Sequence, residues 1–193
     1  MDDLATTCAR EPVNSVAATV AGMSGVRRTR TTMSDGRELF YFDDTEPYPD
    51  RSVPDTRDLP PVVTGSYTRF DVLTGEWVII AAHRMDRTFL PPARNCPLCP
   101  TRPGREPTEI PVADYDVVVF ENRFPSLAVS APDVPKAVAG NPLWRQRPGR
   151  GRCEVVCFTS DHNSSFSALS ARRARTVIEA WADRTAALSA MPG

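Results

Sequence analysis

Histidine, lysine and long apolar runs are scarce in this chain of 193 residues. Only His83 and His162 carry an imidazole, and Lys136 is the only lysine. No apolar run approaches the ~18 residues of a membrane-spanning helix, and the acidic opening MDDLATTCAR lacks the apolar segment of a secretory signal. The formal net charge of −1 provides no overall field toward nucleic acid or anionic lipid. We therefore expect a cytoplasmic protein with no nucleic-acid or membrane partner.

Arginine and proline are abundant instead. The 19 prolines are about twice the usual ~5%. The excess of arginine fits either a GC-rich genome or a protein that handles phosphate, because the planar guanidinium binds phosphate through paired N–H groups. The five cysteines, an odd number, do not suggest a disulfide framework. In a cytosolic chain, a C-x-x-C pair indicates a metal or redox site.

The first third of the chain shows little hydrophobic periodicity. Residues 1–33 are predicted to form a disordered N-terminal extension, with its basic cluster Arg27, Arg28 and Arg30 in solvent. The run DGRELFYF predicts one short strand that starts near Arg37. We therefore divide the chain into this extension and one domain, residues 34–193.

Residues 65–160 are typical of strands and turns. YTRFDVL and EWVIIAA flank Thr74-Gly75 and predict a hairpin. YDVVVFE (115–121) and CEVVCFT (153–159) predict two further strands, whereas residues 125–150 look like loop. Cys153 and Cys157 share one strand face, so we interpret them as core residues and not as metal ligands.

A long helix is predicted after the last strand, with Ser170 as its N-cap. Apolar residues recur at helical spacing and predict a stripe that packs on the core. The stripe consists of Ala174, Val177, Ile178, Trp181, Ala182, Thr185 and Leu188. The fold class is therefore α+β, an antiparallel sheet with a long helix packed across one face.

Candidate chemistry lies in the loops. Cys96 and Cys99 can grip one tetrahedral ion but form only half of a zinc site, and the surrounding prolines favour a loop over the helix of a thioredoxin-like redox pair. His162 directly follows a strand, either as a further ligand or as an exposed turn residue. Arg84 and Arg87 follow another strand, either as a clamp for a diphosphate or as a surface pair.

Four segments carry a resemblance to a known family. RFDVLTGEWVIIAAHRMDR, CPLCP, VVVFENRFPSL and CEVVCFTSDHNSSF occur in this order. Together they resemble the N-terminal half of galactose-1-phosphate uridylyltransferases, a branch of the histidine-triad superfamily, and DGRELFYF is similar to the start of the actinobacterial form. The resemblance covers residues 34–190 except 131–150, which look like an insertion. It implies an incomplete half-barrel with a zinc-knuckle loop at its edge.

The resemblance also implies an activity. The family exchanges a uridylyl group between UDP-glucose and galactose-1-phosphate in galactose metabolism, through a uridylyl-histidine intermediate. A neutral imidazole suits this chemistry because it attacks phosphorus and departs again readily. Two alternatives stay open, a relative acting on dinucleoside polyphosphates and a zinc-knuckle module that binds a nucleotide or RNA through loops such as Arg145–Arg152.

Site residues follow from the resemblance position by position. Its zinc ligands correspond to Cys96, Cys99 and His162, so zinc is the expected cofactor. Its nucleotide contacts correspond to Arg84, Arg87 and Asn122, and Arg123 stands beside them as a further substrate-binding candidate.

The family's catalytic motif H-P-H-G-Q is absent, since no histidine follows His162. We therefore expect residues 34–193 to be an N-terminal uridylyltransferase domain truncated before that motif, as a fragment, a frameshifted frame or part of a split gene. The resemblance assigns no catalytic residue to this chain, which we expect to be inactive alone. A homodimer and pairing with a separate C-terminal half are the assemblies we consider.

Overall fold

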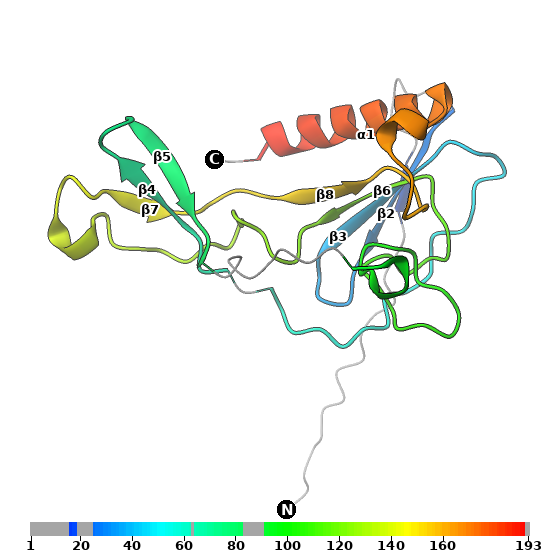
Figure 1. The fold of residues 1–193 in the computed structure, drawn as a ribbon, viewed down its shortest axis with the longest axis horizontal. Coiled ribbons are helices and arrows are strands. Elements are labelled where there is room, and N and C mark those ends of the chain that lie inside the picture. The colour runs from blue at the N-terminus through cyan, green and yellow to red at the C-terminus, as the bar shows by residue number, and fades with distance from the viewer. Residues whose placement is uncertain (1–15, 19–24, 63, 83–90, 192–193) are drawn as a thin grey trace, which may run out of the picture.

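Two antiparallel sheets and one long helix account for the regular structure of residues 16–18, 25–62, 64–82 and 91–191, the part that this computed structural model describes (Figure 1). The larger sheet has the order β1-β2-β3-β6-β8, with β1 Val16–Ala18, β2 Arg27–Thr32, β3 Glu38–Asp43, β6 Val117–Glu121 and β8 Glu154–Cys157. The smaller sheet has the order β5-β4-β7, with β4 Tyr67–Asp71, β5 Glu76–Ile80 and β7 Gln146–Pro148. The predicted α+β class is confirmed, with two sheets where one was expected.

The helix α1, Ala171–Ser189, lies along one face of the larger sheet (Figure 1). Three short 3₁₀ turns complete the described part, namely η2 Ala93–Asn95, η3 Val138–Gly140 and η4 Phe166–Ala168. Within the described ranges, no helix combines the length and apolarity needed to cross a bilayer.

The core surrounds the central strands β3 and β6, which are buried on both faces. Their alternating side chains divide between two apolar clusters. On one face, Leu39 and Tyr41 pack with Ile110, Val112 and Tyr115. On the other face, the cluster contains Phe40, Phe42, Val117, Val119, Val177 and Ala180. The sheet is therefore covered by α1 on one side and by the segment around residues 110–115 on the other.

The predicted disordered extension is wrong for its last part, because Arg27–Thr32 form strand β2 and pair with β3 in antiparallel register. Two basic side chains of this strand have acidic partners on other elements, one on the adjacent strand β3 and one on α1. Arg28 is 3.3 Å from Asp183, and Arg30 is 2.5 Å from Glu38. These ion pairs neutralise a run that looks like a solvated tail in the sequence. Residues 1–15 and 19–24 of the expected extension lie outside the described residues.

The helix starts where predicted but turns a different face to the core. The Ser170 hydroxyl accepts a hydrogen bond from the Arg173 amide at 3.2 Å, which confirms the N-cap. Val177 is buried as predicted. Ile178 and Trp181, in contrast, are 56% and 47% exposed, so the predicted packing stripe is wrong at these positions. The residues that are buried are Thr176, Val177, Ala180 and Arg184.

The smaller sheet confirms the predicted hairpin and adds a strand that was not expected. Strand β7 lies within residues 131–150, the presumed insertion, and pairs with β4. Arg145 and Arg147 lie over the rings of Phe70 and Trp77 at 3.9 and 4.2 Å. These cation–π contacts hold a short segment without an alternating apolar pattern against the hairpin.

Candidate metal centre

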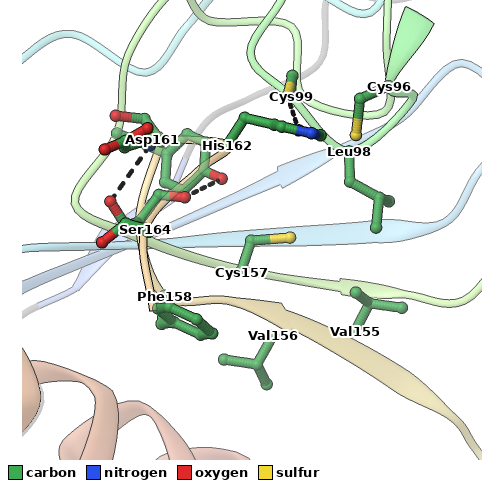
Figure 2. A pocket seen from close by; sticks show the side chains of 13 residues that line it. Cys96, Leu98, Cys99, Val155, Val156, Cys157, Phe158, Asp161, His162 and Ser164 are labelled. Atoms are coloured by element: carbon green, nitrogen blue, oxygen red, sulfur yellow. Dashed lines mark hydrogen bonds between the residues drawn. The ribbon is translucent and has the colours of Figure 1, made fainter. Parts of the chain in front are cut away.

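Cys96, Cys99 and His162 come together at one point, although His162 is distant from the cysteines in the sequence. One ligand atom from each lies within 4.8 Å of the other two, and the Cys99 Sγ to His162 Nδ1 distance is 3.2 Å. Figure 2 shows the imidazole pointing toward both sulfurs. In a tetrahedral zinc site, bond lengths of about 2.3 Å to sulfur and 2.0–2.1 Å to nitrogen place such atoms about 3.5 Å apart. The donors are therefore spaced as ligands of one ion.

A tight turn presents the two cysteines. It follows η2, and the Cys99 amide donates to the Cys96 carbonyl at 3.3 Å. Beyond the turn, the Thr101 amide donates to the Ile110 carbonyl at 2.9 Å, next to a parallel bridge between Pro100 and Ile110. The cysteines thus lie in a loop, as the prolines predicted, and this loop is fastened to the buried Ile110.

A second turn, just beyond β8, presents His162. The Thr159 side chain accepts from the Asp161 amide at 3.2 Å, and the Asp161 carboxylate accepts from the Asn163 amide at 3.0 Å. The Thr159 carbonyl also accepts a hydrogen bond of 2.7 Å from the Tyr115 hydroxyl. These bonds direct the histidine back toward the cysteine loop.

The electrostatics of the cysteine pair favour a cation. Burial, together with a hydrogen bond to Cys96, raises the pKa of the Cys99 thiol to about 11. Because the two sulfurs lie close together, both thiols ionise only where a nearby positive charge compensates the two negative charges. A coordinated metal cation provides such a charge. Two thiolates and one imidazole form a donor set typical of zinc and other borderline-soft ions. The residues therefore fit a metal ion of this class.

A hollow of about 280 Å³ adjoins the three residues, with apolar walls contributed by β8 and Leu98 (Figure 2). Cys157 also lines it but does not belong to the group of donors. Burial raises the pKa of the Cys157 thiol to about 12, and the side chain packs against the core cluster. The interpretation of Cys157 as a core residue is thus confirmed.

The predicted nucleotide contacts lie elsewhere or outside the described part. Arg84 and Arg87 are outside the described residues, as is His83. Asn122 follows β6, and its backbone N–H donates to the Cys153 carbonyl at 2.8 Å, just before β8 begins. His162 follows the opposite end of β8, so the structure does not bring Asn122 to the metal group.

The side chains of Asn122 and Arg123 both have protein partners. The Asn122 side-chain oxygen accepts from the Phe124 amide at 2.9 Å. The Arg123 guanidinium forms an ion pair with Asp35 at 3.0 Å. Asp35 and Tyr115 were not identified from the sequence, because Arg123 and Thr159, the partners that link them to other segments, are distant in the chain and leave no local pattern.

Comparisons with known proteins show which sequences this chain resembles. A family model described as galactose-1-phosphate uridyl transferase, N-terminal domain, matches residues 61–192. The galactose-1-phosphate uridylyltransferase of Streptomyces lividans is 45% identical over 170 residues, which cover 86% of this chain and 41% of the relative. That of Thermotoga maritima is 40% identical over 121 residues, which cover 63% and 36%.

A solved structure titled "Structure of uridylyltransferase" superimposes with a TM-score of 0.44 at 25% identity, covering 62% of this chain and 35% of that one. The chain spans less than half the length of the two relatives from Streptomyces lividans and Thermotoga maritima.

Proposed function

The chain belongs to the galactose-1-phosphate uridyl transferase family, and from this premise we propose that it provides the metal-binding and nucleotide-contacting part of such an enzyme. The proposed reaction is exchange of a uridylyl group between UDP-glucose and galactose-1-phosphate, in cytoplasmic galactose metabolism. The observation that carries the proposal is the convergence of Cys96, Cys99 and His162 within 4.8 Å, in a chain whose relatives bear that name.

The proposed metal is Zn²⁺, held by two thiolates and one imidazole, with the fourth tetrahedral position left to water or another group. When bound, zinc would cross-link the cysteine loop to the end of β8 and so stabilise the edge of the domain. The role of this chain's residues is to hold the three donors in position. We also propose that the larger sheet corresponds to the incomplete half-barrel that the family resemblance implies.

For the nucleotide, we propose that Arg84 and Arg87 clamp the diphosphate, since they follow β5 closely in sequence. Asn122 is the proposed contact for the uridine moiety. Arg123 stays a further candidate, because a guanidinium has five N–H donors and the ion pair with Asp35 involves one nitrogen, Nη1.

The proposed chemistry requires a free imidazole aimed at phosphorus, and the sequence holds only two. His162 is a proposed metal ligand, and nothing assigns such a role to His83. We therefore propose that the reaction needs a further polypeptide segment that carries the imidazole, such as a separate C-terminal half. A homodimer of this chain would add only a second copy of the same two histidines.

The arginine-rich segment weighs against an RNA-binding module, because its side chains contact this protein itself. Arg145 and Arg147 lie over aromatic rings, Arg150 pairs with Asp133 at 3.0 Å, and Arg152 pairs with Glu154 at 2.8 Å. Intramolecular partners of this kind leave fewer free guanidinium groups for phosphate.

The metal content of the purified chain tests the proposal. We expect one zinc per chain, and none in the double variant C96S/C99S. C153S is the matched control, because Cys153 also lies in the described part but outside the donor group, and it should keep its zinc. Equal zinc in the parent and the double variant would show that the metal centre is wrongly assigned.

A further inference from the structure

Residues 108–115 form hydrogen bonds to both loops that carry the candidate metal ligands. The Thr108 hydroxyl lies 2.5 Å from the Cys99 carbonyl oxygen, and the Tyr115 hydroxyl lies 2.7 Å from the Thr159 carbonyl oxygen. Each hydroxyl donates to the backbone of a different ligand loop. Neither touches a ligand atom itself, so any effect on the metal acts through loop position.

Thr108 fastens the cysteine loop at more than one point. Its amide donates to the Thr101 side chain at 2.9 Å, while its hydroxyl donates to the carbonyl of Cys99. The Thr101 amide in turn donates to the Ile110 carbonyl at 2.9 Å. Hydrogen bonds therefore join residues 99–101 to residues 108–110, immediately after the second cysteine. This limits the positions that the Cys99 sulfur can reach.

Tyr115 fastens the histidine turn. Its side chain is only 4% exposed, and its hydroxyl reaches the carbonyl of Thr159, where the turn begins. Among the described residues, this bond and the contact between Cys99 and His162 are the hydrogen bonds that connect residues 159–164 to a distant part of the chain. The hydrogen bonds that remain in this turn are internal to it.

The part of the chain between the two hydroxyls is anchored in the core through two buried side chains. Ile110 and Val112 are 0% and 5% exposed and pack in the same core cluster as Tyr41 and Val118. A close-packed interior of this kind fixes backbone positions. The two hydroxyl groups thus hold their separation, and with it the separation of the two loops.

We propose that Thr108 and Tyr115 are positioning residues of the metal centre, which hold Cys99 and His162 at the spacing of two ligands on one ion. This inference rests on the proposed metal site and adds a mechanism to it. Partners outside the ligand shell commonly change metal affinity 10–100-fold, because they pre-organise the ligands and spare the metal the ordering of flexible loops.

Cobalt titration of the full chain tests this. Co²⁺ bound by thiolates gives charge-transfer and ligand-field bands that report both affinity and geometry. We expect Y115F and T108V each to bind Co²⁺ about 10-fold to 100-fold more weakly than the parent, with altered band intensities. Y67F is the matched control, because the hydroxyl of Tyr67 lies in the smaller sheet beside Arg69. T108S keeps the hydroxyl and should restore parental binding.

The outcomes separate the two proposals. Failure of the parent to bind Co²⁺ would refute the metal site itself. If the parent binds but Y115F and T108V match it in affinity and spectrum, the positioning role is wrong. Lower thermal stability with unchanged cobalt spectra would likewise assign the two hydroxyls to folding alone. If Y115F does not fold, comparison of T108V with T108S decides.

Discussion

Arg184 of α1 and Glu154 of β8 form a two-pronged ion pair, in which Nε and Nη2 each donate to a different carboxylate oxygen at 2.9 Å. The two side chains are only 8% and 5% exposed. At the other end of the helix, the Arg173 guanidinium donates to Asp44 at 2.9 Å. Because few apolar side chains of α1 are buried, ion pairs provide much of its attachment to the sheet.

Replacing Glu154 by glutamine should therefore destabilise the chain strongly. The substitution removes the carboxylate that pairs with both Arg184 and Arg152 and leaves Arg184, among the described residues, only the longer ion pair of 3.5 Å with Asp183. Breaking a buried pair costs about 3–5 kcal/mol. The measurement is urea unfolding at neutral pH. E179Q is the control, because Glu179 pairs with the exposed Arg175 along the helix, and such pairs contribute only about 0.3–0.5 kcal/mol. Equal losses in the two variants would contradict an electrostatic attachment.

Stability should fall at acidic pH because of Asp44. Burial opposes ionisation of Asp44, but hydrogen bonds from Arg173 and Thr176 outweigh it and hold the pKa of this carboxyl below its usual value. A lowered folded-state pKa stabilises the protein above the unfolded value of about 3.9, and this contribution is lost as the pH falls through the folded pKa. Urea unfolding between pH 7 and pH 3 should show the decline.

The variant D44N should be less stable than the parent at pH 7, with a shallower decline toward pH 3, because it lacks the titrating group. D58N, at an exposed position, should follow the parent at every pH. Parallel curves for D44N and the parent would assign the acid sensitivity to other carboxylates, such as Glu38. Burial opposes ionisation of Glu38 too, but Arg152, Arg30 and Arg184 together hold the pKa of that carboxyl below its usual value.

Local patterns in the sequence predicted the elements that depend on local physics. Turn chemistry predicted the hairpin at Gly75, and runs of β-branched residues predicted the strands β6 and β8. Capping preferences predicted the N-cap at Ser170. Strand β2 was missed because Arg-rich and Thr-rich segments look solvated until their acidic partners are known. The helix face was wrong for the same reason, since the burial of Arg184 depends on Glu154, thirty residues away in the chain.

The candidate site divides in the same way. Cys96, Cys99 and His162 were predicted because residue type and spacing carry the chemistry of metal ligands. Thr108 and Tyr115 bind backbone carbonyl groups, which every residue has, so no sequence pattern identifies their partners. Tertiary structure alone reveals that one segment serves both ligand loops.

The proposed diphosphate clamp predicts that R84A/R87A weakens UDP-glucose binding. Each charge-assisted hydrogen bond lost should cost about 1.5–3 kcal/mol, which isothermal titration calorimetry would measure. R150A/R175A removes the same charge from two exposed ion pairs and should bind like the parent. Equal affinity of R84A/R87A and R150A/R175A would show that the arginines are not a specific clamp.

The last prediction concerns catalysis by the 193-residue chain alone. Incubated with UDP-glucose labelled on the α-phosphate, it should stay unlabelled, and no UDP-galactose should form on addition of galactose-1-phosphate. A uridylyl-enzyme needs an imidazole with a free lone pair in line with the phosphorus. His162 places Nδ1 3.2 Å from the Cys99 sulfur and is the proposed third ligand of the metal centre. Removal of a nucleophile commonly lowers turnover by many orders of magnitude.

The Streptomyces lividans relative, 45% identical over 170 residues, serves as the positive control for the labelling. Acid-labile label on His83 of the chain alone would contradict the prediction, because it would reveal a nucleophile that the family resemblance does not assign. Label that forms only after addition of a second polypeptide, one that supplies the remaining length of the relative, would support joint action instead. The two results differ in which chain carries the phosphorus, so peptide mapping of the labelled protein distinguishes a self-sufficient enzyme from one part of a shared active site.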